Sequence, residues 1–297
     1  MLSRSGLNMF AILGASGKAG RATIEKLRAQ GASVRAVVRQ SSNTADLEAL
    51  GCQIAFADLH DTDAISKAIE GASAVQVICP VNPRAKDAAT DMENIIDAIV
   101  GALTATRPER ILAISDYGAQ IDSGTGITMI FHYLEARLST VPGTLIFLRS
   151  AEHMQNWARV IKPALETGAL PSFHHPVNKI FPTISAPDLS GIAVEFLLGK
   201  PAGTRPRIVH AEGPRRYSAL DVAATLSEIS GRQIVAQALS EKEWIPTLTR
   251  AGVSESYANL VRELFVAHNA GRIDVEPGGE VRLGTTGLRE ALRPLCG

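Results

Sequence analysis

The feature that most constrains the fold of this chain is a run of three glycines spaced three apart, placed directly after a short apolar segment. The segment is Met9–Leu13, and the glycines are Gly14, Gly17 and Gly20. Apolar residues at helical spacing then continue as far as Gly31. A short apolar run followed by helical periodicity predicts a strand buried on both faces that leads directly into a helix.

In such a strand-to-helix turn each glycine has its own expected role in binding a dinucleotide. Gly14 allows the tight turn, Gly17 lets a pyrophosphate approach the backbone, and Gly20 lets the helix pack close to the strand. The free N–H groups and positive dipole end of the helix favour the phosphates. The alternative is a glycine-rich turn without a ligand. The residues expected at the pyrophosphate are Gly14, Ala15, Ser16, Gly17, Lys18, Ala19 and Gly20.

The end of the next expected strand, 33–38, indicates which dinucleotide is bound. Proteins of this fold that bind NAD carry an acid near this position, which holds the ribose hydroxyls. Here the position holds Arg39, whose guanidinium can grip a 2′-phosphate with two parallel hydrogen bonds. Lys18 could add a second cation. We therefore expect NADP(H) to be preferred over NAD(H), the alternative being that Arg39 is only a solvated loop residue.

Strands and helices continue to alternate along the first half of the chain. Alternation of this kind predicts an α/β protein with a doubly wound parallel Rossmann sheet, whose ligand crevice lies at the carboxyl ends of the strands. Asp58 is expected to meet the adenine or to cap a helix, with Asp61 the better cap. The further expected strands are 53–58, 74–80, 110–115 and 144–149, and a helix is expected over 86–105. The further residues expected at the crevice are Asp58, Leu59, Cys79, Pro80 and Ser115.

After residue 150 this rhythm changes, and a smaller α/β lobe is expected. The predicted domains are therefore an NAD(P)-binding Rossmann domain over 1–150 and a substrate-binding lobe over 151–297, with some segments returning to the first domain. A helix is expected to run from 151 until Pro163 ends it, and Asp188 is expected to open another that ends at Leu198. Residues 218–230 and 241–270 are also expected to be helical.

Charge and cysteine content exclude several classes of function. The chain has 30 basic and 30 acidic residues, so no strong field for nucleic acid or an anionic membrane is expected. Its three cysteines make neither a disulfide framework nor a metal cluster, and the histidine spacing gives no metal site. No apolar run approaches the roughly 20 residues that span a bilayer, and no secretory signal is visible. We expect a cytoplasmic protein without a metal ion.

Several motifs, in their order along most of the chain, resemble the NmrA-like family of atypical short-chain dehydrogenase/reductases. They are GASGKAG, VVRQ, ADLHD, FLRSAEHMQNW, FPTISAPDLSGIA, VHAEGPRRYSALDVAATL and TTGLREALRPL. The resemblance implies an extended Rossmann domain with a small C-terminal lobe. Some members resemble NADPH-dependent reductases, and others resemble nucleotide sensors that act through a protein partner, so both functions remain open. The oligomeric state is open as well.

Reduction of a carbonyl by hydride needs a proton donor near the developing alkoxide. The chain contains no Tyr-x-x-x-Lys pair of the kind that short-chain dehydrogenases use, and Tyr133 with Arg137 is the nearest approximation. Tyr117 follows the fifth strand and is expected to face the crevice. His132 is the third candidate catalytic residue. A surface or packing role is the alternative for His132, and shaping of the substrate pocket is the alternative for Tyr117.

The resemblance adds one departure from the family pattern. Glu135 and Arg149 align with a recurring Glu and Arg of the family, and many of its reductases carry a lysine four residues before that glutamate. Phe131 stands there in this chain. An acceptor such as a quinone tolerates this loss, because solvent can protonate the stable hydroquinone anion. The expected activity is NADPH-dependent hydride transfer to a small, largely apolar quinone, enone or imine. The alternative is an NADP(H)-sensing regulator without turnover.

Overall fold

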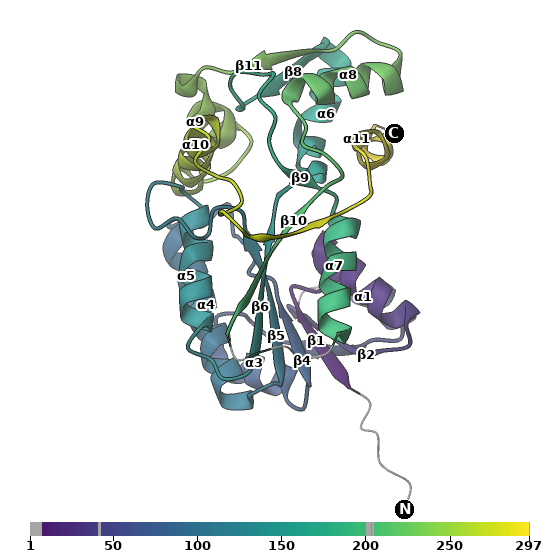
Figure 1. Cartoon of the computed structure of the whole chain (residues 1–297), viewed down its shortest axis with the longest axis vertical. Helices are drawn as coiled ribbons and strands as arrows, with labels where there is room; N and C mark the ends of the chain where they lie inside the picture. Colours follow the sequence, from purple (N-terminus) through teal and green to yellow (C-terminus); the bar gives the residue numbers. More distant parts are fainter. Residues whose placement is uncertain (1–7, 41–42, 200–202, 204, 297) are drawn as a thin grey trace, which may run out of the picture.

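A computed structural model describes residues 8–40, 43–199, 203 and 205–296 of the chain. Its main feature is an eight-stranded sheet in the order β12-β10-β6-β5-β4-β1-β2-β3, in which every pair of neighbours is parallel (Figure 1). The strands are β1 (Met9–Leu13), β2 (Ser33–Val38), β3 (Gln53–Phe56), β4 (Ala74–Val77), β5 (Arg110–Asp116), β6 (Thr144–Ser150), β10 (Arg207–Glu212) and β12 (Glu280–Leu283). The doubly wound α/β fold predicted from the sequence is confirmed.

Helices cover both faces of this sheet and produce two apolar cores. In Figure 1 the helices α4 and α5 lie on one side of the sheet, and α1 and α7 lie on the other. Helix α1 places Ile24 and Leu27, both fully buried, against the sheet. The helices on the first side are α3 (Thr62–Ile69), α4 (Ala88–Thr106) and α5 (Thr128–Leu138). Those on the second are α1 (Lys18–Ala29), α2 (Ala45–Ala49) and α7 (Ala186–Leu198).

The order of the strands reverses between β1 and β4, and this point fixes where a ligand can bind. From β1 the chain adds β2 and β3 toward one edge, and it then returns to add β4, β5 and β6 on the other side. The connecting helices therefore leave a crevice outside the carboxyl ends of β1 and β4. Strand β4 ends at Val77 and not at Pro80 as predicted, because Ile78 leaves the ladder and packs beside the Gly14 turn.

A second, smaller lobe with its own apolar core lies at the top of Figure 1. Its elements are the 3₁₀ helix η1 (Met154–Trp157), α6 (Ala158–Thr167), β8 (Ala169–Ser172), α8 (Ala219–Ser230), β11 (Val235–Ala238), α11 (Leu288–Leu292) and the 3₁₀ helix η2 (Arg293–Leu295). The two-residue strands β7 (Glu152–His153) and β9 (Thr183–Ile184) pair where the chain passes between the lobe and the sheet. Helices α9 (Glu241–Arg250) and α10 (Glu255–Asn269) form a hairpin that docks on the start of α4.

Two helices after residue 150 differ from the prediction at their boundaries. The segment expected to be helical from 151 first forms β7 and η1, and α6 begins only at Ala158. Pro163 lies inside α6, which continues to Gly168, where a left-handed backbone ends it. The buried Ile161 and Ala164 anchor this helix in the core of the small lobe, so one missing backbone hydrogen bond does not break it. Helix α7 is capped by Ser185, whose hydroxyl accepts from the amide of Asp188. Among the residues that the structure describes, no helix is long and apolar enough to cross a membrane.

Candidate cofactor and active site

The three glycines in the turn after β1 differ in how strictly the fold itself requires them. Gly14 has a left-handed backbone with φ of +76°, and a Cβ on Gly20 would overlap the carbonyl oxygen of Gly14. Gly17 has an ordinary φ of −78°. A Cβ on Gly17 would lie 3.4 Å from the carbonyl oxygen of Gly14, which is ordinary contact. The fold therefore needs glycine at 14 and 20, whereas at 17 the backbone angles and the space would also admit a small side chain.

The N-terminus of α1 is also arranged for an anion. None of the described side chains caps its first turn, whereas Asp61 accepts from two amides of α3 and Asp87 caps α4. The first residue of α1 is Lys18, where a dipole argument alone would favour an acid. The first-turn amides and the Lys18 ammonium can thus act together on phosphate oxygens.

Beyond the ends of β2 and β3 the chain carries Arg39 and Asp58, both exposed. The carboxylate of Asp58 accepts from the backbone amide of His60 at 3.0 Å and lies 3.1 Å from its Nδ1. These bonds, with a smaller contribution from the charge of Arg39, hold the pKa of Asp58 below its ordinary value. Asp61 and not Asp58 caps α3, as predicted. Leu59 is buried below them.

The segment after β4 forms the middle of the rim. Cys79 is buried, and Pro80 beside it is exposed. Burial, with a smaller effect of Asp91, raises the pKa of the Cys79 thiol to about 12. The thiol is therefore not a nucleophile at neutral pH.

At the carboxyl ends of β5 and β6 the structure gathers a group of polar residues that the sequence analysis did not assign to the site. Asp116 is the register partner of Ser150, and the hydroxyl of Thr128 donates to its carboxylate at 2.6 Å. Glu152 and His153 follow directly. Burial lowers the pKa of His153, Glu152 opposes this, and the nearby Lys18 lowers it further. These strand ends therefore lie within electrostatic reach of the glycine turn.

Ser115, expected at the rim, has its side chain engaged elsewhere. Its hydroxyl donates to Glu135 of α5 at 2.6 Å. Arg149 binds the same carboxylate with two hydrogen bonds of 2.9 and 2.7 Å, and all three side chains are buried. This Ser–Glu–Arg group fastens α5 to the sheet, and the Ser115 hydroxyl is engaged within it. The Glu135 and Arg149 noted from the family resemblance are thus structural partners.

The prediction that Tyr117 faces the crevice is wrong. It is 2% exposed, and its hydroxyl donates to Glu212 of β10 at 2.9 Å. Burial and the charge of Glu212 raise the pKa of Tyr117 well above its ordinary value. The chain turns at Gly118, with φ of +87°, and this turn folds the ring back into the core. Tyr117 is therefore a packing residue.

The side chains of the other two predicted catalytic residues are bonded within the protein. The Tyr133 hydroxyl donates to Asp97 of α4 at 2.9 Å, and Arg137 donates to the same oxygen at 2.7 Å. This is a half-exposed bridge between two helices. His132 contacts the carbonyl oxygen of Ala119 through Nδ1 at 2.8 Å. It lines a hollow of about 420 Å³ that is formed by α5 and its neighbours and that does not include the glycine turn.

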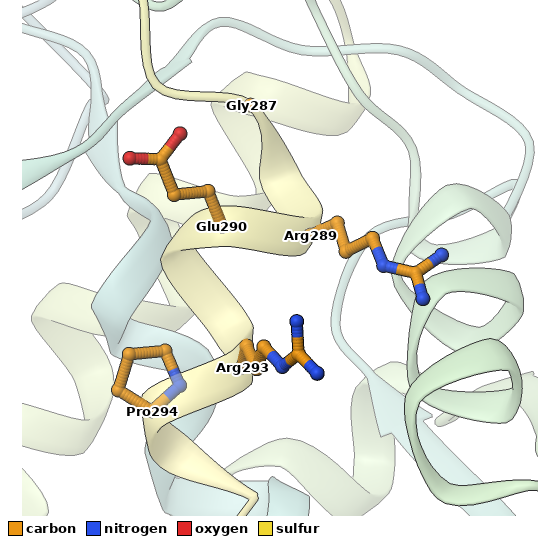
Figure 2. A pocket seen from close by; sticks show the side chains of 5 residues that line it. All are labelled: Gly287, Arg289, Glu290, Arg293 and Pro294. Atoms are coloured by element: carbon orange, nitrogen blue, oxygen red, sulfur yellow. The ribbon is translucent and has the colours of Figure 1, made fainter.

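A second hollow, of about 530 Å³, lies on the small lobe and not on the crevice (Figure 2). It is lined by Gly287, Arg289, Glu290, Arg293 and Pro294, a single stretch of chain in α11 and η2. Arg289 is paired there with Glu228 of α8 at 2.9 Å. The hollow contains no residue of the glycine turn or of the strand ends. Among the described residues no group of His, Cys, Asp and Glu is arranged to hold a metal ion.

The chain is similar to a known family model and to two known reductases. Residues 14–140 match a family model described as NAD(P)H-binding. The chain is 25% identical over 274 residues to the NAD(P)H azoreductase of Xenophilus azovorans, covering 91% of this chain and 92% of the relative. It is 24% identical over 265 residues to quinone oxidoreductase 2 of Escherichia coli strain K12, covering 89% of each.

Solved structures extend the likeness to the whole fold. The E. coli NADPH-dependent quinone oxidoreductase matches with a TM-score of 0.79 at 22% identity, over 97% of this chain and 100% of that one. Its complex with NADPH matches with a TM-score of 0.78, at the same identity and coverage. The triphenylmethane reductase of Citrobacter sp. matches with a TM-score of 0.79 at 19% identity, over 97% and 99% of the two chains. Residues 14–140 thus match an NAD(P)H-binding family model, and the whole chain shares the Rossmann-like fold of these solved structures.

Proposed function

We propose that the protein is an NADPH-dependent reductase of flat, conjugated small molecules such as quinones, enones, imines or azo compounds. The observation that carries the proposal is Gly17, a glycine that the fold itself does not require, at the uncapped start of α1. When bound, NADPH supplies the hydride for the reduction. The similarity to an azoreductase and a quinone oxidoreductase over about nine tenths of the chain supports this reaction class.

The residues proposed to hold the cofactor all lie at the carboxyl ends of the strands β1 to β5. The backbone from Gly14 to Gly20 and the Lys18 ammonium would bind the pyrophosphate. Arg39, exposed directly after β2, would bind the 2′-phosphate and so select NADPH over NADH. Asp58 and Leu59 would lie at the adenosine, and Cys79, Pro80 and the backbone of Ser115 toward the nicotinamide.

An aromatic cluster beside the end of β6 supports a flat acceptor. His174 stacks on Phe181 with ring centroids 3.5 Å apart, and its Nε2 lies 3.1 Å from the carboxylate of Glu152. Phe265 of α10 packs edge-on to His174 at 4.9 Å. Trp157 is 7% exposed and packs in the core of the small lobe, so its ring offers no open surface to an acceptor. His174 and Phe181 are buried, and Phe265 is partly exposed, so a planar acceptor would contact this cluster through Phe265.

The test measures binding and turnover separately. Tryptophan fluorescence is titrated with NADPH, NADH and NADP⁺, and NADPH oxidation is then followed at 340 nm with quinones, enones, imines and azo dyes. Tight NADPH binding with turnover of at least one acceptor class is the expected result. Binding without turnover across the whole panel would refute the reductase and favour a nucleotide sensor. Equal affinity for NADPH and NADH would refute the role of Arg39.

A further inference from the structure

We propose that Asp116, at the carboxyl end of β5, is the residue that donates a proton to the acceptor during reduction. The inference rests on the proposed reductase function and deepens it. The three donors expected from the sequence are engaged elsewhere: Tyr117 with Glu212, Tyr133 with Asp97, and His132 with the Ala119 carbonyl oxygen. A reductase of this fold still needs a proton at the nicotinamide end of the crevice for most acceptors.

The position of Asp116 within its strand suits this role. The preceding residues of β5 are all buried, whereas Asp116 is partly exposed. It lies between the end of β4, which carries Cys79, and the end of β6, where Ser150 is its register partner. Asp116 therefore lies at the carboxyl edge of the sheet, on the strand next to the switch point between β1 and β4.

The groups around Asp116 favour its protonated form. Burial raises its pKa, and the nearby carboxylates of Glu152 and Glu135 raise it further. The hydroxyl of Thr128 and the amide of Tyr117 donate to the carboxylate and oppose the shift, and the resulting pKa is about 7. Each of these neighbours comes from an element packed against the end of β5. A carboxyl group with this pKa can hold a proton at neutral pH and release it to a stronger base.

The proposed step balances for an azo acceptor. NADPH supplies a hydride to one nitrogen, and the π electron pair of the N=N bond moves to the other nitrogen. That nitrogen takes the proton of Asp116, so an N–H bond forms while the O–H bond breaks. The product is a hydrazine, and the Asp116 carboxylate regains a proton from solvent. A quinone needs this proton less, because its reduced anion is comparatively stable.

The first test observes the carboxyl group directly in the protein without cofactor. Protein labelled with ¹³C at the aspartate carboxyl is titrated by NMR, and the Asp116 signal is assigned by its loss in Asp116→Asn. We expect this signal to titrate near pH 7 and its midpoint to fall in Glu152→Gln, which removes a neighbouring negative charge. Titration of the assigned signal below pH 5 would overturn the proposal.

The second test uses the difference between acceptors. Asp116→Asn is expected to lower kcat at least 100-fold with an azo dye and less than 10-fold with a quinone, while the Kd for NADPH changes less than 3-fold. In the wild type, kcat for the azo dye falls about tenfold per unit above pH 7, and in Glu152→Gln the fall begins at lower pH. The matched control is Asp97→Asn on the outer surface of α4, which leaves both activities unchanged.

The outcomes separate this inference from the function on which it rests. A wild type that turns over an acceptor, with an Asp116→Asn variant that keeps azo reduction within 3-fold, overturns the role of Asp116 alone. An equal loss with both acceptors also overturns it, because a merely structural defect would not distinguish them. A wild type that oxidises no NADPH with any acceptor overturns the proposed reductase itself.

Discussion

Alanine at Gly17 and alanine at Gly20 should have opposite effects on binding and on stability. At Gly17 the added methyl group meets only ordinary contact, 3.4 Å from the Gly14 carbonyl oxygen, at an ordinary φ of −78°. The poorer helix cap costs roughly 0.5–1 kcal/mol, and the reduced freedom of the unfolded chain offsets about the same amount. The free energy of unfolding should therefore change by less than about 1 kcal/mol.

The effect of Gly17→Ala on the cofactor should be much larger. The methyl group occupies the side from which a pyrophosphate would reach the first-turn amides of α1. Loss of one charge-assisted hydrogen bond is worth about 1.5–3 kcal/mol, which corresponds to a roughly 10- to 150-fold higher Kd. At Gly20 the methyl group would overlap the Gly14 carbonyl oxygen, so Gly20→Ala should cost about 1–3 kcal/mol of stability.

The assay pairs thermal unfolding of the protein without cofactor with an NADPH titration of each variant. We expect Gly17→Ala to keep its melting temperature within about 2 °C of the wild type and to lose affinity. Gly20→Ala should melt several degrees lower. The reasoning is refuted if Gly17→Ala binds NADPH within twofold of the wild type, or if it is destabilised as much as Gly20→Ala.

Three further substitutions test other parts of the site. Arg39→Asp should raise the Kd for NADPH about 10- to 100-fold and spare NADH in parallel titrations, while Arg289→Ala on the small lobe changes neither. Tyr117→Phe should lower the free energy of unfolding in urea by about 1–2 kcal/mol and leave kcat within 3-fold, because its hydroxyl is bonded to Glu212 in the core. Since the pKa of Asp116 is raised from 3.8 to about 7, the folded state holds this proton more tightly and stability falls as pH rises through that interval. Asp116→Asn lacks this loss and should be more stable than the wild type above pH 7, by about 2 kcal/mol after solvent screening in urea melts.

The parts of the fold that the sequence predicts correctly are those formed by residues close together along the chain. The strand Met9–Leu13 and its glycine turn, the strand Ser33–Val38 and the Asp61 cap all arise from residues within a few positions of one another, and the structure places them as predicted. The local propensity of proline predicts that Pro163 ends a helix. Packing of α6 into the small lobe overrides that propensity, and the lobe is formed by segments far apart in the sequence.

The same distinction explains which site residues the sequence could indicate. The glycine turn and Arg39 could be proposed from the sequence because their expected roles depend on the backbone and on chain order. The direction of Tyr117 could not, since it depends on Glu212, which lies 95 residues further on. The sequence offers one indication of a role for Asp116, which is its position as an acid at the end of a mainly apolar strand. Its significance depends on Glu152, which the fold brings near it from the end of β6.

The protonation of Asp116 links the two parts of the molecule. Asp116 and Glu152 are close and poorly solvated, so the ionised form of one disfavours that of the other. Burial opposes the charge of Glu152, but the hydrogen bond and charge of His174 outweigh it, and the pKa of Glu152 lies below its ordinary value. His174 follows β8 of the small lobe and stacks on Phe181. Burial is the main cause of the raised pKa of Asp116, and the charge on Glu152 adds to it. The packing of the small lobe around His174 favours the charge on Glu152, and it therefore contributes to the proton affinity of Asp116 at the edge of the sheet where the acceptor is proposed to bind.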